Sequence, residues 1–183
     1  MTSRFKNHIN QITAYDLISL FTYKHNLQLP KIVNISVNIS DPSLATVKSK
    51  ILNYIYLVKL ITNQTPKETV SRKNKIHLKI KKNSITGCKV DLNSSKSLDL
   101  LQYITLFIIP QIKNFSGFSY SEMNKNQISI HIRDWYKFIP NNFTNKVNLF
   151  NKSLSSIQIT IKFKNKHQEE AISIVNSLNF PIK

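Results

Sequence analysis

The chain has 183 residues, 41% of them hydrophobic, and its 26 Lys and Arg against 9 Asp and Glu give a net charge of +17. This length and apolar content suffice for a single domain over residues 1–183 with its own core. The charge predicts a polyanionic partner, nucleic acid first and an anionic membrane second, because self-repulsion destabilises a compact chain that no partner neutralises. The single cysteine, Cys88, excludes an internal disulfide and argues against a zinc site.

The first third of the chain reads as helix, strand and helix. Residues 3–24 have helical apolar spacing, residues 31–39 alternate as a strand, and Pro42 opens a helix that reaches about residue 62. A turn around Pro66 follows.

Residues 62–92 combine strong positive charge with alternating apolar positions. Ile76, Leu78 and Ile80 alternate with polar residues, which predicts a basic hairpin over about 69–92 with one buried and one positive face. Lys79 and Lys81 are then expected opposite Leu78 and Ile80. Such a ribbon suits a phosphate backbone, although lysines that protect an exposed sheet edge would give a similar pattern. The cations of this segment are Lys67, Arg72, Lys73, Lys75, Lys79, Lys81, Lys82 and Lys89.

The rest of the chain adds helices and strands without a βαβ pattern. The order predicts an α+β domain, with an antiparallel sheet, helices packed on one face and a long basic hairpin loop. The expected elements are a helix over 94–109 that stops at Pro110, a loop over 113–127, a strand over 128–135, an irregular Asn-rich stretch over 136–156, a strand over 157–163 and a helix over 167–178.

Catalysis has little support in the sequence. The histidines are scattered, no Gly-rich phosphate loop is present, and the adjacent acids Glu169 and Glu170 suit the start of a helix. We therefore predict no enzyme activity, no metal and no cofactor. A metal-dependent nuclease is the alternative, although clustered carboxylates are missing. A peripheral membrane protein is a further alternative. The aromatic residues Tyr120, Trp135, Tyr136 and Phe138 suit core or interface positions better than base stacking.

An ordered series of motifs resembles one family, the universal large-subunit ribosomal protein five, of bacterial or organellar type. The likeness covers nearly the whole chain and depends on the order of the motifs rather than on any one of them. The motifs are Pro30-Lys31-Ile32, Ile35-Ser36-Val37-Asn38, Thr62-Asn63-Gln64-Thr65-Pro66, Ser71-Arg72-Lys73, Gly87-Cys88-Lys89-Val90, Pro110–Ser119, Ile157–Ile161, Glu169-Glu170-Ala171 and Phe180-Pro181.

The resemblance implies a structural component of the large ribosomal subunit and no small-molecule substrate. Members of that family bind 5S rRNA in the central protuberance, contact P-site tRNA through a basic loop and bridge to a protein of the small-subunit head. By position, the resemblance implies rRNA contacts at Asn38, Gln64, Lys89 and Asp91. It implies tRNA contacts at Arg72, Lys73, Lys75, Lys79, Lys81 and Lys82.

Asp91 departs from the family pattern. The family usually has Thr at this position, and a carboxylate that faces phosphate is repulsive. Asp91 therefore either weakens 5S rRNA binding or marks a remodelled contact. The family's glycines in the loop tip and near residues 123–127 are also replaced here, as an A+T-rich genome favours.

Residue usage indicates an A+T-rich coding sequence. Lys outnumbers Arg by 23 to 3, and the chain has 26 Ile but only 2 Gly. The match to the family begins close to residue 4, which leaves almost no room for an import presequence. Together these features predict a protein made inside an organelle, a mitochondrion first, with a plastid or a bacterial cytoplasm as alternatives. Sequence does not show whether that ribosome contains a 5S rRNA.

Overall fold

The structure is a computed structural model that describes residues 4–47, 49–93, 95–112, 117, 123–124, 126–133, 135–138, 156–165 and 167–181. Within these residues six strands form one sheet in the order β2-β3-β1-β6-β5-β4. β2 pairs antiparallel with β3, and β4 pairs antiparallel with β5. The strands are β1 (Lys31–Ser40), β2 (Lys67–Val70), β3 (Ile85–Asn93), β4 (Met123–Asn124), β5 (Gln127–Ile132) and β6 (Ile157–Lys164).

The strands separate into an apolar and a polar face because their side chains alternate. On β6 every odd position from Ile157 to Phe163 is buried, and the even positions from Gln158 carry polar side chains. β5 repeats this pattern, with Ile128, Ile130 and Ile132 buried. Helices pack on the apolar face, so burial of this face supplies most of the stabilising hydrophobic area.

Contacts within the chain group its residues into two compact units. The first comprises residues 1–35, 92–130 and 160–183, and the second comprises residues 36–91 and 131–159. β1, β3, β5 and β6 each contribute residues to both units. A single domain over 1–183 therefore stays a prediction.

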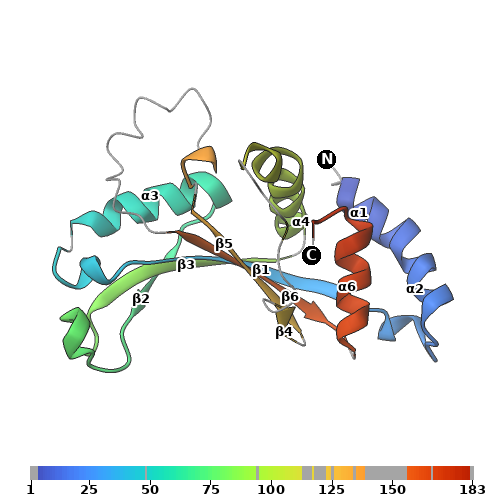
Figure 1. Cartoon of the computed structure of the whole chain (residues 1–183), viewed down its shortest axis with the longest axis horizontal. Helices are drawn as coiled ribbons and strands as arrows, with labels where there is room; N and C mark the ends of the chain where they lie inside the picture. The colour runs from blue at the N-terminus through green and yellow to red at the C-terminus, as the bar shows by residue number, and fades with distance from the viewer. Residues whose placement is uncertain are drawn as a thin grey trace. The chain divides into compact units, whose positions relative to one another are not determined.

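The first unit contains three helical segments. A helix runs through α1 (Arg4–His8), the π-helical segment Ile9–Thr13 and α2 (Ala14–Leu20), and its π segment contacts α6 (Gln168–Ser177). α1 also contacts α4 (Ser95–Tyr103). Figure 1 shows α1 and α2 running beside α6.

The second unit contains α3 (Lys50–Thr62) and the β2–β3 pair. In Figure 1, α3 lies along one side of these strands, and the connection from β2 to β3 lies at their end. Asp41 fixes the entry to α3: its carboxylate accepts hydrogen bonds from the Ser43 N–H at 2.8 Å and from the buried Tyr54 hydroxyl at 2.5 Å. Asp41 therefore ties the end of β1 to the helix above it.

Gly87 allows β1 and β3 to approach closely. A Cβ atom at this position would overlap the carbonyl oxygen of Ile39 on β1. The backbone of β1 cannot move away cheaply, because the Asp41 N–H also donates to the Thr86 carbonyl at 2.9 Å. Glycine is thus required at residue 87 for steric reasons.

The α+β prediction is confirmed, with an antiparallel sheet and helices on one face. Several boundaries differ from the sequence prediction. Pro42 opens only a short 3-10 turn (Pro42–Ala45), and α3 starts at Lys50. The helix expected over 94–109 changes to π geometry at Ile104 and to a 3-10 turn that includes Pro110, since proline cannot donate an in-register helical hydrogen bond.

Other sequence predictions lie outside the described residues. They comprise the Asn-rich stretch 141–151, residues 113–116 and 118–120 of the loop motif, and the Tyr120 side chain. In the described part, Phe138 is buried and Tyr136 is exposed. No helix in the described ranges is long and apolar enough to cross a membrane.

Candidate nucleic-acid interface

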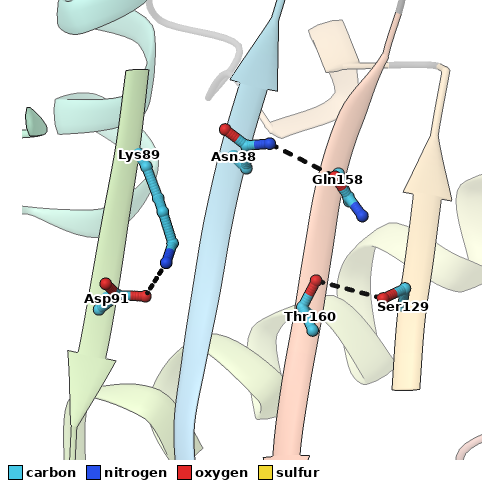
Figure 2. A network of polar contacts seen from close by, with 6 residues as sticks. All are labelled: Asn38, Lys89, Asp91, Ser129, Gln158 and Thr160. Carbon is cyan, nitrogen blue, oxygen red and sulfur yellow. Dashed lines mark hydrogen bonds and ion pairs between the residues drawn. The ribbon is translucent and has the colours of Figure 1, made fainter. Parts of the chain in front are cut away.

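Four side chains of the second unit form what we call the sheet patch: Asn38, Lys89, Asp91 and Gln158. Figure 2 shows them on one side of their strands, with Asn38 on β1, Lys89 and Asp91 on β3 and Gln158 on β6. The Asn38 amide donates to the Gln158 side-chain oxygen at 3.3 Å. Amide groups retain further donor and acceptor capacity beyond this one bond, so the patch offers hydrogen bonds as well as charge.

Lys89 and Asp91 form an ion pair within the sheet patch. Their Nζ and Oδ1 atoms lie 3.0 Å apart, and the side chains are 38% and 47% exposed. Lys89 also lies directly across from Lys67 on β2, where two like charges repel. Asp91 therefore compensates the positive charge on this stretch of β3, and Lys89 in turn screens the carboxylate.

Gln64 lies in the turn between α3 and β2 and is half-buried. Thr62 organises this turn, because its hydroxyl donates to the Val58 carbonyl at 2.7 Å and lies 3.4 Å from the Gln64 N–H. Asn63 ends α3 in a left-handed conformation with φ 51°. In the described residues no hydrogen bond joins the Gln64 side chain to the sheet patch, so Gln64 is a separate candidate contact.

The connection between β2 and β3, residues 71–84, is here called the basic loop. Its backbone is closed at the base by a hydrogen bond from the Ser71 N–H to the Ser84 carbonyl at 2.9 Å. Farther out, Lys75 and Ile80 exchange two backbone hydrogen bonds of 2.9 and 3.1 Å. These bonds give the loop a defined backbone in place of the predicted long two-stranded ribbon.

The predicted alternation within the loop is wrong. Ile76–Leu78 form a 3-10 turn, and Lys79 adopts a left-handed conformation with φ 54°. Ile76 is consequently 88% exposed and Leu78 47% exposed, whereas Ile80 is only 7% exposed. Lys79 and Lys81 thus do not form a row opposite Leu78 and Ile80.

The predicted loop cations are nonetheless all at the surface. The six are Arg72, Lys73, Lys75, Lys79, Lys81 and Lys82, and each is exposed. Residues 71–84 contain no carboxylate. Over the described ranges none of the six forms an ion pair, so their charge is available to an external anion.

Buried ionisable groups beneath the patch are structural. Burial, followed by the negative charge of Glu68, raises the pKa of the Cys88 thiol to about 12, which makes it unreactive at neutral pH. Burial acts to raise the pKa of Asp41, but hydrogen bonds from Tyr54 and Ser43 outweigh it, and the pKa lies below its usual value. Asp41 is therefore an ionised anchor for α3.

No candidate metal centre appears in the part of the chain that the structure describes, where no three His, Cys, Asp or Glu side chains are grouped suitably. Sequence analysis missed Gln158, which completes the sheet patch. Its polar position between Ile157 and Ile159 gave the signal, but its proximity to Asn38 depends on β6 lying next to β1.

Comparison with known proteins adds independent evidence. Residues 85–182 match the model for the C-terminus of the ribosomal protein five family, the family of the uL5 proteins. The chain is 30% identical to large ribosomal subunit protein uL5 of Buchnera aphidicola subsp. Baizongia pistaciae over 181 residues, 98% of this chain and 96% of the relative. It is also 30% identical to the mitochondrial large ribosomal subunit protein uL5m of Reclinomonas americana over 137 residues, 74% of this chain and 75% of the relative.

Proposed function

The chain belongs to the uL5 family of ribosomal proteins, and on that premise we propose that it binds 5S rRNA, where present, through the sheet patch and P-site tRNA through the basic loop. It is a large-subunit ribosomal protein, a structural component with rRNA and ribosomal proteins as partners. The proposal extends to a place in the central protuberance, a bridge to a small-subunit head protein, a single-domain architecture and no enzyme activity.

The observation that carries the tRNA contact is the charge of the basic loop. Six exposed cations stand on a closed backbone without a carboxylate among them. Lysines make adaptable point-charge contacts to phosphate, and the Arg72 guanidinium suits bidentate contact. A tRNA surface presents phosphates at a density that such a loop can neutralise.

The sheet patch supports the rRNA contact differently. Asn38 and Gln158 supply amide groups, and Lys89 supplies a cation whose charge Asp91 partly offsets. Because Asp91 is paired, its carboxylate does not oppose rRNA phosphate alone. This pairing favours a remodelled rRNA contact over a lost one. Gln64 is proposed as an rRNA contact separate from the patch.

We further propose that the protein functions in the mitochondrial matrix, in the mitochondrial ribosome. Similarity to uL5m and to a bacterial uL5 is equal in identity, so residue usage supports this choice and not the comparisons. Plastid and bacterial ribosomes are the alternatives. Localisation of a tagged protein to mitochondria, with rRNA in the same sucrose-gradient fraction, is the expected result.

A charge reversal in native ribosomes tests the tRNA contact. Ribosomes that carry Arg72→Glu with Lys73→Glu are expected to bind P-site tRNA about tenfold more weakly, because two phosphate contacts become repulsive. The matched control is Lys24→Glu with Lys31→Glu, which changes the net charge equally at exposed positions of the first unit. Filter binding of aminoacyl-tRNA to the purified ribosomes measures the effect.

The two variants separate specific contact from overall charge. Unchanged tRNA affinity in the loop variant, with the protein still present in the large subunit, contradicts the proposal. An equal loss in both variants would show that only net charge matters. Incubation of the purified protein with labelled RNA and Mg²⁺ tests the nuclease alternative, and we expect no cleavage.

A further inference from the structure

A hollow of about 470 Å³ lies where the basic loop meets the ends of β1 and β3. It belongs entirely to the second unit. Its volume falls within the range of about 300–1,000 Å³ of small-ligand sites. The sequence pattern did not predict it, because its walls come from residues 40–42, 71–80 and 86.

The walls of the hollow divide into two chemical kinds. Arg72, Lys73 and Lys75 contribute three of the loop cations. Leu78 and Ile80 contribute apolar surface, although Leu78 is half-exposed. An exposed leucine among cations is costly to hydrate and gains from an apolar or ring-shaped partner.

A hydroxyl group lies beside these walls. The Ser71 Oγ donates to the Lys73 carbonyl at 2.6 Å, which fixes the hydroxyl and leaves its lone pairs free to accept. A ligand that matches the hollow thus combines an anionic group, a flat ring and a hydroxyl donor. A nucleotide of RNA has all three, as phosphate, base and ribose 2′-OH.

We propose that this hollow binds a single unstacked RNA nucleotide, with its phosphate on Arg72, Lys73 and Lys75 and its base against Leu78 and Ile80. This inference rests on the proposed function, because it specifies how the basic loop holds its RNA. Proteins read single-stranded RNA mainly through unstacked bases, so a tRNA or rRNA loop is the suitable source. A loop that acted only through charge would need no apolar wall.

The test measures binding of the full chain to two short probes at physiological salt. One is an oligouridylate, whose bases stack weakly, and the other has the same backbone with all bases removed. The wild-type protein is expected to bind the oligouridylate about tenfold more tightly. Leu78→Ser is expected to remove most of this difference and to leave affinity for the abasic probe unchanged.

Ile76→Ser is the matched control, because Ile76 is exposed in the same loop but does not line the hollow. It should alter neither affinity. Equal wild-type affinity for both probes, or an equal loss for both probes in Leu78→Ser, overturns the nucleotide site. Arg72→Ala with Lys73→Ala should weaken both probes; if it weakens neither, the proposed RNA contact of the loop fails instead.

Discussion

The basic loop and the sheet patch offer RNA two different kinds of surface. The loop exposes six cations and has no carboxylate, so its attraction to phosphate is long-ranged and depends on salt. The sheet patch pairs its cation with Asp91 and adds the Asn38 and Gln158 amides. Its contacts depend on hydrogen-bond geometry, and salt affects them less.

This difference suits the two proposed partners. A tRNA enters and leaves the ribosome, and contacts through adaptable cations allow rapid association. An rRNA that stays bound gains more from side chains that the sheet holds in fixed positions. The same chain thus combines a steering surface with a positioning surface.

The largest expected effect comes from breaking the sheet without altering a polar side chain. Gly87→Ala forces β1 and β3 apart, because the new methyl group overlaps the Ile39 carbonyl. We expect a loss of about 3 kcal/mol in the free energy of unfolding. Urea denaturation followed by circular dichroism measures it. Stability within about 0.5 kcal/mol of wild type would show that the strands adjust freely.

Salt dependence should separate the two regions directly. Arg72→Ala with Lys73→Ala is expected to weaken tRNA binding about thirtyfold and to flatten the log–log salt slope by about 2. Asn38→Ala should weaken 5S rRNA binding only about threefold and leave its slope unchanged. Fluorescence anisotropy titrations at several salt concentrations check both. A changed slope in Asn38→Ala would contradict the distinction.

Acid should affect the sheet region through Asp41. The pKa of Asp41 is lower in the folded protein than its ordinary value of 3.8, so its stabilising effect is present above that value and is lost as pH falls through the folded pKa. Asp41→Asn should therefore cost about 1–2 kcal/mol at pH 7, and the difference from wild type should shrink below about pH 4. Urea denaturation across this range tests it, with Tyr54→Phe to isolate one hydrogen bond. A difference that stays constant with pH would exclude the ionised form as the cause.

The smallest expected effect concerns Asp91. Asp91→Asn removes the carboxylate that offsets Lys89, so affinity for 5S rRNA should rise about twofold to threefold. Stability should change by less than about 1 kcal/mol, as for other surface ion pairs. Asp99→Asn, a neutral substitution outside the patch, is the charge-matched control. Weaker binding in Asp91→Asn would mean that the carboxylate itself contacts the RNA.

Sequence patterns predicted the sheet well where one face is buried. The alternation of Ile157, Ile159 and Ile161 persists in the structure because a one-residue shift would expose all of them. β1 follows the same logic, with Ile35, Val37 and Ile39 buried. The α+β class followed from the order of such segments.

The basic loop was predicted poorly because its conformation depends on interactions that apolar spacing does not encode. Positive φ angles at Lys79 and Asn83 turn the backbone, and the Asn74 side chain accepts from the Lys82 N–H at 2.6 Å. Ile76 therefore stays exposed despite a strand-like position. Charge was predictable at each lysine, but the hollow was not, because it needs the loop beside Ser40 and Pro42.

The position of β6 has a consequence for synthesis of this protein. Residues 157–164 insert between β1 and β5, although more than a hundred residues separate β6 from β1 along the chain. On a translating ribosome β1 must wait with one edge unpaired until this late segment emerges. The sheet is thus completed near the end of elongation, which makes the nascent chain dependent on protection of that edge against mispairing.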